Sequence, residues 1–255
     1  MESRKNLTPR ETEVAHGQRL VRDNNCRGCH IVEGEGGAIR PSVAKVYVAT
    51  EGLSEEDALA FSPPTLHGEG AKTQPEWLFR FLKAPVPIRP WLSVRMPTFG
   101  FSDGEGADLV RYFSALDRQP FPYETIPSKR MTAEEMQAAQ KLFSKDYFSC
   151  LSCHQQGAIK PLGDPSRWAP DLALARERLR PRWLVTWLQD PQKVQPGTRM
   201  PTFFSSPDAV PPDVLNGSLD RQIQVLADYM VYGMHQKSAS AGPGGERLAY
   251  GAHGR

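Results

Sequence analysis

The pentapeptide Cys-x-x-Cys-His occurs twice in this chain of 255 residues, and the two copies contain all four of its cysteines. This spacing is the attachment signature of c-type haem, in which two thiols bond to one porphyrin and the adjacent histidine ligates its iron. We therefore expect two covalently attached haem c groups, with His30 and His154 as iron ligands. The thioether bonds would come from Cys26, Cys29, Cys150 and Cys153.

Three other uses of paired cysteines remain as alternatives. A zinc site can be built from two Cys-x-x-Cys pairs, but it does not require a histidine after each second cysteine. A thioredoxin-like motif lies in a βαβ setting, for which the sequence gives no indication. Disulfides are conceivable in a secreted chain. Haem attachment accounts for both histidines as well as the cysteines, and we favour it.

The rest of the chain also repeats. The sequence Arg-Met-Pro-Thr-Phe at 95–99 recurs at 199–203, each time downstream of one Cys-x-x-Cys-His motif. Pro64 and Trp77 match Pro170 and Trp183 at the same offset of 106 residues. A capping box, the Thr-x-x-Glu pattern that opens a helix, begins 18 residues before the first cysteine of each motif. We interpret the chain as a tandem duplication with loops of different length.

Each half resembles a class I cytochrome c domain. That family runs from a helix through Cys-x-x-Cys-His, a Pro-x-Leu loop and short helices to an axial methionine and a C-terminal helix. The stretch Ser-Pro-Pro-Thr-Leu-His-Gly at 62–68 is similar to the family's Gly-Pro-x-Leu-His-Gly, and the resemblance extends from about residue 8 to about residue 234. It implies an all-α fold of two tandem cytochrome c-like domains, each a few short helices and loops wrapped around a covalent haem.

The expected domains are residues 1–118 and 132–235, joined by a Pro-rich linker at 119–131 and followed by a flexible tail at 236–255. A long loop is expected between the first histidine and the first matched methionine. The last helix of each half should pack against the first helix of that half. Apolar periodicity and capping signals predict helices at about 8–22, 75–83, 104–117, 132–146, 181–189 and 218–234.

Met96 and Met200 are the candidates for the sixth iron ligand, because both precede a proline in matched contexts. A bis-histidine site is the main alternative. His16 and His235 are expected at the surface and His253 in the tail, and His67 matches a family position that does not bind iron. The resemblance further implies that the carbonyls of Pro64 and Pro170 accept a hydrogen bond from the two ligand histidines and so orient their rings.

Other side chains are candidates for contact with the haem groups. Arg95 and Arg199 would pair with haem propionates, since a planar guanidinium suits a carboxylate, or else be solvated. Trp77 and Trp183 would line the haem pocket or donate to a propionate, or else fill the core. The basic stretch at 176–182 is expected to be a solvated helix face, or a surface that steers an acidic redox partner.

Histidine and methionine together close the coordination sphere, so we expect transfer of single electrons and assign no catalytic residue. The chain would link a redox protein donor to an acceptor, either as a free carrier or as a peripheral subunit of a respiratory or photosynthetic membrane complex. The enzyme alternative is a di-haem peroxidase or a sulfur-compound-oxidising cytochrome, which would need an open iron position or a cysteine ligand. A zinc-stabilised scaffold is the third hypothesis.

Charge and hydropathy bound the remaining possibilities. The formal net charge of +2 does not favour binding to nucleic acid, and no run of apolar residues is long enough for a transmembrane segment. The N-terminal sequence does not look like a signal peptide. Since haem attachment to such motifs normally occurs outside the cytoplasm, we expect a periplasmic or extracytoplasmic protein whose targeting segment or anchor is missing, with any membrane association through that anchor or a partner.

Overall fold

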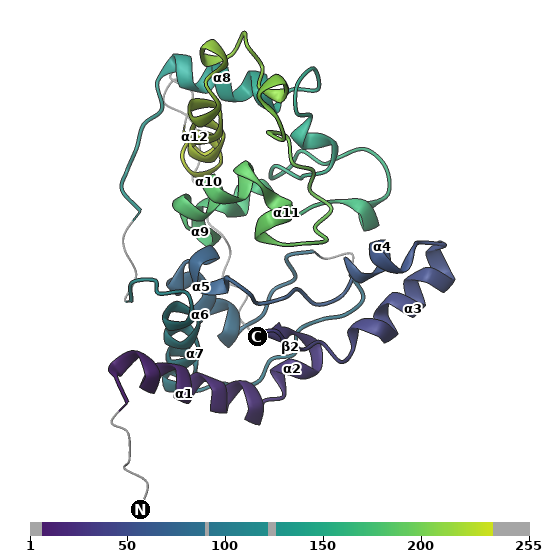
Figure 1. The fold of residues 1–255 in the computed structure, drawn as a ribbon, viewed down its shortest axis with the longest axis vertical. Helices are drawn as coiled ribbons and strands as arrows, with labels where there is room; N and C mark the ends of the chain where they lie inside the picture. The colour runs from purple at the N-terminus through teal and green to yellow at the C-terminus, as the bar shows by residue number, and fades with distance from the viewer. Residues whose placement is uncertain (1–6, 90–91, 122–125, 237–255) are drawn as a thin grey trace, which may run out of the picture.

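The computed structural model describes residues 7–89, 92–121 and 126–236, which form a mainly helical molecule of two halves stacked along its long axis (Figure 1). The tail at 237–255, with His253, and residues 122–125 of the expected linker lie outside the described residues. Within the described part, no helix has the length and apolar character needed to cross a membrane.

The described residues of the first half form seven α-helices and a small hairpin: α1 (Pro9–Asp23), α2 (Cys26–Cys29), β1 (Ile31–Val32), β2 (Glu35–Gly36), α3 (Arg40–Glu51), α4 (Glu55–Leu59), α5 (Glu69–Lys72), α6 (Pro75–Lys83) and α7 (Asp103–Leu116). The α-helices of the second half are α8 (Ala133–Phe143), α9 (Ala175–Arg178), α10 (Pro181–Gln189), α11 (Pro191–Val194) and α12 (Leu219–Val231). Short 3-10 turns complete it: η1 (Cys150–Ser152), η2 (Pro165–Arg167), η3 (Leu172–Leu174), η4 (Pro207–Ala209), η5 (Leu215–Gly217) and η6 (Gly233–His235).

All six expected helices are present, and α6 and α10 have the expected bounds. The capping boxes that start at Thr8, Ser102 and Thr132 are formed, with side-chain and backbone bonds in both directions. Two helices are shorter than predicted. The helix α8 ends where Ser144 turns to an extended conformation, and α12 ends at Val231, after which the chain tightens into η6.

Each half has its own buried apolar cluster, built where its last helix crosses its first. In the first half α7 packs on α1 and also contacts α5 and α6, while in the second half α12 packs on α8 and α10. All buried members of the first cluster fall between Val21 and Phe113, and all those of the second between Met131 and Tyr232. The predicted packing of terminal helix on first helix is therefore confirmed in both halves.

The crossing of α1 and α7 depends on a close approach at Gly17. A Cβ atom at this position would lie 2.1 Å from the Cβ of Tyr112, which is fully buried on α7. Glycine therefore lets the two backbones come closer than any other residue would allow.

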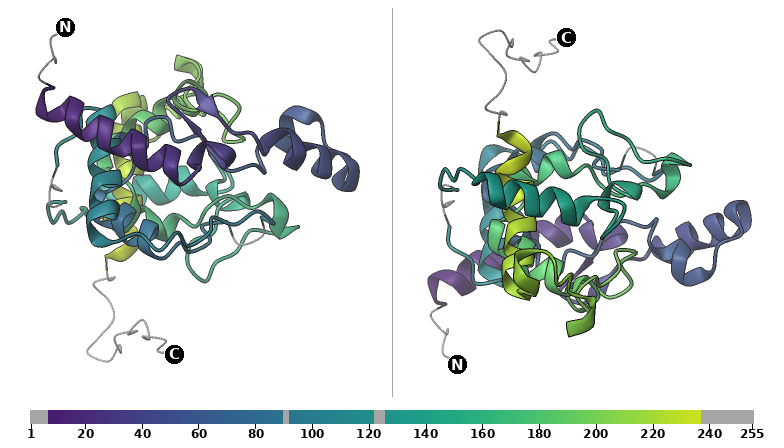
Figure 2. Two further views of the ribbon diagram at one scale, coloured as in Figure 1. Left: turned by 90° about the horizontal axis from the view of Figure 1, so that it is seen from below. Right: turned by 90° about the horizontal axis from the view of Figure 1, so that it is seen from above.

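The stretch at 40–59, within the long segment between the first histidine and the first matched methionine, is mainly helical although no helix was predicted there. It folds into α3 and α4, which extend to one side of the molecule (Figure 2). Gly52 ends α3 in a left-handed conformation, and the Ser54 side chain caps α4 by accepting from the Asp57 backbone N–H. Its own small cluster of Val43, Phe61 and Leu92, with Tyr47 stacked on Phe61 at 4.3 Å, stabilises this extension.

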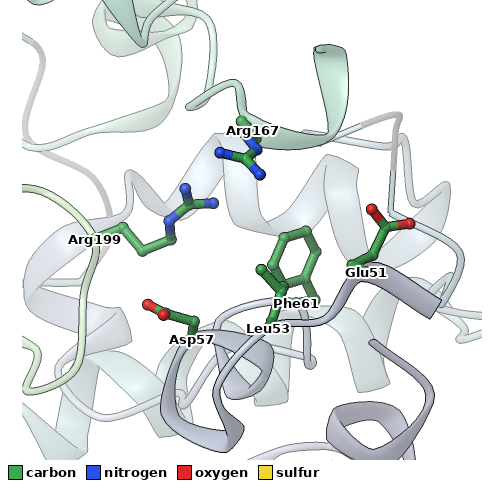
Figure 3. Close-up of a pocket in the computed structure, with 6 residues that line it drawn as sticks. All are labelled: Glu51, Leu53, Asp57, Phe61, Arg167 and Arg199. Atoms are coloured by element: carbon green, nitrogen blue, oxygen red, sulfur yellow. The ribbon is translucent and has the colours of Figure 1, made fainter. Parts of the chain in front are cut away.

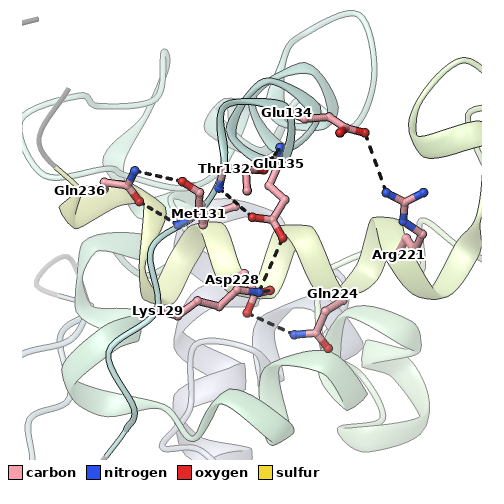
Figure 4. Close-up of polar contacts among 9 residues, drawn as sticks. All are labelled: Lys129, Met131, Thr132, Glu134, Glu135, Arg221, Gln224, Asp228 and Gln236. Carbon is pink, nitrogen blue, oxygen red and sulfur yellow. Dashed lines mark hydrogen bonds and ion pairs between the residues drawn. The ribbon is translucent and has the colours of Figure 1, made fainter. Parts of the chain in front are cut away.

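The chain that enters the second half is held against α12 by polar contacts (Figure 4). Lys129 forms an ion pair with Asp228, a carboxylate that is otherwise buried. The backbone N–H of Met131 donates to Gln236 Oε1 at 3.0 Å, and Gln236 Nε2 donates back to the Met131 carbonyl at 3.1 Å. These bonds fix the start of α8 beside the end of α12.

A short antiparallel bridge between Thr73 and Leu179 joins the two halves. The Gln74 N–H donates to the Arg178 carbonyl and the Arg180 N–H donates to the Lys72 carbonyl, both at 2.9 Å. Residues 72 and 74 correspond to 178 and 180 under the 106-residue offset of the repeat. The contact is thus pseudo-twofold, because equivalent residues exchange equivalent bonds.

The close approach of α1 and α7 at Gly17 predicts that a glycine-to-alanine substitution has different effects at positions 17 and 104. Gly17→Ala should destabilise the protein by about 1–3 kcal/mol, since the added methyl group overlaps Tyr112. Gly104→Ala on α7 should be neutral or stabilise by up to about 1 kcal/mol, because its nearest neighbouring atom is 3.9 Å away. Urea unfolding measures both, and equal effects would contradict the proposed close contact.

Candidate functional site

Both Cys-x-x-Cys-His motifs begin with the same local backbone. Asn25 and Ser149, the residues before the first cysteines, both have a left-handed conformation with φ near 50°. A single helical turn follows, and it closes with a bond from the histidine N–H to the first cysteine carbonyl, 2.8 Å at His30 and 3.0 Å at His154. The two copies of the motif therefore share one backbone arrangement, in which the turn is α-helical at α2 and 3-10 at η1.

The two histidine rings are held by equivalent hydrogen bonds. His30 Nδ1 lies 2.8 Å from the Pro64 carbonyl oxygen, and His154 Nδ1 lies 2.8 Å from that of Pro170. Since a carbonyl oxygen only accepts, Nδ1 carries the proton in each ring and Nε2 keeps its lone pair. These are the bonds that the resemblance led us to expect, and they leave Nε2 available as a metal ligand.

The proline loops are themselves anchored to the motifs. The Leu66 N–H donates to the Ile31 carbonyl, and the Leu172 N–H donates to the Gln155 carbonyl, both at 2.9 Å. Each acceptor directly follows the motif histidine. Two bonds thus clamp each loop to its histidine in both halves, despite the different lengths of chain between them.

Burial changes the protonation of these side chains. It lowers the pKa of both His30 and His154, only partly offset by their proline carbonyl partners, so both rings are neutral at neutral pH. Neutral imidazole is the form that binds metals. Burial also raises the pKa of Cys26, and it raises that of Cys150 to about 12. Both thiols are consequently protonated before any covalent attachment.

The two matched methionines pack on the same apolar clusters as the motif cysteines of their own half. Met96 and Cys26 contact the first cluster, and Met200 and Cys150 contact the second. The Met200 sulfur accepts a hydrogen bond from Trp187 Nε1 at 2.9 Å. Sequence reasoning missed Trp187, although the offset of 106 residues pairs it with Phe81 and so marks it as a difference between the halves.

Arg95 and Arg199 are both exposed, and their expected pairing with propionates is not tested by these contacts. Arg199 lies 5.8 Å from the ring of Phe61, and Figure 3 shows it with Arg167 above a pocket formed by the α3–α4 extension. This pocket has a volume of about 140 Å³, and its lining contains no cysteine or histidine. It is smaller than typical sites for organic ligands, roughly 300–1,000 Å³, and is not a porphyrin site.

Trp77 and Trp183 lie at the contact between the halves, each beneath a cation from the opposite half. The Arg178 guanidinium lies 5.2 Å from the Trp77 ring, and Lys72 Nζ lies 5.8 Å from the Trp183 ring. Lys72 and Arg178 are themselves equivalent under the 106-residue offset. The contact between the halves thus contains two matched cation–aromatic pairs across the pseudo-twofold axis.

The expectation of a solvated basic face at 176–182 is wrong for Arg178. Arg176 and Arg182 are exposed, but Arg178 Nε is fully buried and has no hydrogen-bond partner among the described residues. Burial lowers the pKa of Arg178. The sequence could not reveal this, because Arg178 is covered in part by Trp77 of the other half.

The contact between the halves holds more positive than negative charge. Lys72, with 14% of its side chain exposed, forms a 3.4 Å ion pair with Glu69. Burial lowers the pKa of Lys72, and burial together with the nearby charge of Arg178 lowers that of Arg89. Glu69 lies near both Lys72 and Arg178, and the charges of Lys72, Arg89 and Arg178 lie close enough to influence one another. Buried charges require counter-charges, and the two propionates that a haem carries are carboxylates that suit this environment.

The alternative uses of cysteine find no support in the geometry. All four thiols are free. No group of three or more His, Cys, Asp or Glu side chains within the described ranges is arranged to hold a metal ion. A zinc site made from the two motifs would need such a group. His16 and His235 are exposed, as expected for surface residues, and His67 is exposed as well.

Comparison with known proteins identifies part of the chain. Residues 14–117 match the sequence model of the family described as cytochrome c. This range contains the first motif, the proline loop, the first matched methionine and α7, so the match supports a c-type cytochrome domain in the first half, a kind of domain that holds a covalently bound haem c. No curated protein matches the chain. No solved structure matches it either.

The excess of enclosed cations predicts an electrostatic effect of Arg178. In the haem-loaded protein, Arg178→Gln should lower a midpoint reduction potential by about 40 mV, which is on the order of 1 kcal/mol. The positive charge of Arg178 favours the reduced iron, and the substitution removes that charge. Arg182→Gln, at an exposed position, is the matched control and should have little effect. Potentiometric titration distinguishes them, and equal shifts would argue against a role for the enclosed charge.

Proposed function

We propose that this protein is a di-haem c-type cytochrome, with one haem in each of two tandem domains, that carries single electrons between a protein donor and a protein acceptor. The observation that carries the proposal is the repetition of one site geometry. Both motifs share the left-handed residue before the first cysteine, the single helical turn and the 2.8 Å bond from histidine to proline.

Each half supplies a complete donor set for haem c. Cys26 and Cys29 would form the thioether bonds of the first group, with His30 and Met96 as the iron ligands. The corresponding set in the second half is Cys150, Cys153, His154 and Met200. Haem iron held by imidazole and thioether gains and loses one electron without changing its ligands, and it offers no open position to a substrate.

The protein around each group would orient the ligands and balance charge. The proline carbonyls hold the imidazoles in the tautomer that leaves Nε2 free. Lys72, Arg89 and Arg178 offer counter-charges for propionates near the contact between the domains. We further propose Arg95, Arg199, Trp77 and Trp183 as haem contacts on the strength of their matched places in the repeat.

The partners that this function requires are redox proteins, free or within a membrane complex of a respiratory or photosynthetic chain. We propose a periplasmic or other extracytoplasmic location, since attachment of haem to Cys-x-x-Cys-His normally takes place there.

The proposal predicts the number of haem groups. The native protein should contain two by pyridine haemochrome assay, with a matching increase in intact mass. Cys26→Ala with Cys29→Ala should leave one covalent haem, and Cys150→Ala with Cys153→Ala should also leave one. A native protein with one haem would limit the function to the first half, and one with none would end the proposal.

Binding of small ligands to iron tests the electron-transfer function against the enzyme alternative. If both irons carry methionine, the reduced protein should not bind carbon monoxide rapidly at neutral pH. Met96→Ala and Met200→Ala should each open one site and allow rapid binding, followed by visible absorption. Rapid uptake by the unaltered protein would instead indicate an open iron position, as a peroxidase requires.

A further inference from the structure

The two halves differ at one residue that adjoins a methionine sulfur. On α10, Trp187 stacks on Trp183 with ring centroids 5.0 Å apart and an interplanar angle of 16°. On α6, Phe81 stacks on Trp77 at 4.9 Å and the same 16°. Phe81 and Trp187 are equivalent under the 106-residue offset, as are Trp77 and Trp183. The two aromatic pairs thus have one geometry but different chemistry.

In the second half, the indole of Trp187 donates to the sulfur of Met200. Nε1 lies 2.9 Å from Sδ. The loop that presents this methionine is also held by Gln192, whose Nε2 donates to the carbonyls of Thr198 at 2.6 Å and Met200 at 3.0 Å. The donor and the acceptor are therefore each fixed by neighbouring structure, on α10 and beside α11.

In the first half, this donor is missing for a chemical reason. The phenyl ring of Phe81 has no polar hydrogen, so it cannot donate to Met96 whatever its position. In the part of the chain that the structure describes, no hydrogen bond to the Met96 sulfur is present. The duplication has consequently kept the stacked ring but not the donor.

A hydrogen bond to a ligand sulfur withdraws electron density from it. The sulfur then donates less to iron, which destabilises the oxidised state more than the reduced state and raises the reduction potential. We propose that Trp187 tunes Met200 in this way and makes the haem of the second half the one of higher potential. This inference rests on the proposed function, in which Met96 and Met200 are iron ligands.

The difference in potential sets a direction within the molecule. At equilibrium a single electron resides mainly on the second half, so the first half receives electrons and the second half delivers them to an acceptor. A typical net hydrogen bond corresponds to a factor of about five in an equilibrium constant. For a one-electron couple, at 59 mV for each factor of ten, this is about 40 mV.

Trp187→Phe is the sharpest test, because it installs the residue that the first half already carries on the same stacked partner. In the two-haem protein, a potentiometric titration should show the upper midpoint potential lowered by about 40 mV. This shift corresponds to a change of about fivefold in the ratio of reduced to oxidised haem at a given potential. The lower midpoint should stay in place. The absorption band for charge transfer from sulfur to iron should shift as well. This band reports on the bond between the Met200 sulfur and iron independently of electron-transfer rates.

Trp187→Tyr provides the matched comparison, since tyrosine and phenylalanine differ by one hydroxyl donor. A higher upper midpoint in the Tyr variant than in the Phe variant would attribute the effect to the hydrogen bond rather than to ring size. An unchanged upper midpoint in Trp187→Phe, a shift confined to the lower midpoint, or equal values for the Phe and Tyr variants would each overturn the inference. The haem count is measured first, so a failure of the di-haem proposal is recognised separately.

Discussion

The hydrogen bond between a half-buried histidine ring and a proline carbonyl is the interaction on which the rest of this structure depends. It joins the Cys-x-x-Cys-His turn to a distant loop, 34 residues away at His30 and 16 residues away at His154. Because the carbonyl accepts from Nδ1, the bond selects one tautomer and directs Nε2 away from the loop. The last and first helices of each half cross in an apolar cluster of their own, and the matched methionine of that half packs on it.

The contact between the halves shows how a duplicated sequence acquires properties that neither copy has alone. Lys72 and Arg178 occupy equivalent positions, and each lies over the tryptophan of the other half. Each cation is thus covered in part by the other half. The region then holds cations in excess of carboxylates, an arrangement suited to a group that brings its own negative charge. This is the physical reason to connect the interface with the proposed haem groups rather than with packing alone.

The two halves of the repeat differ at a position where a difference would affect the proposed electron transfer. The aromatic stacks on α6 and α10 have the same geometry, yet one ends in a phenyl ring and the other in an indole. The surrounding loops differ too, since α3 and α4 extend only from the first half and reach toward Arg199 in the second. A shared fold therefore supports the inference of two similar sites that are not equal in potential.

The sequence by itself determined the features that depend on a few neighbouring residues. The capping boxes at Thr8, Ser102 and Thr132, the bounds of α6 and α10, and the turn at each cysteine pair follow from local chemistry. Only the tertiary structure decided that Arg178 is enclosed, that α3 and α4 fold on Phe61, and that Trp187 meets the Met200 sulfur. Each of these depends on segments distant in the chain coming within a few ångströms of one another, which local propensities do not encode.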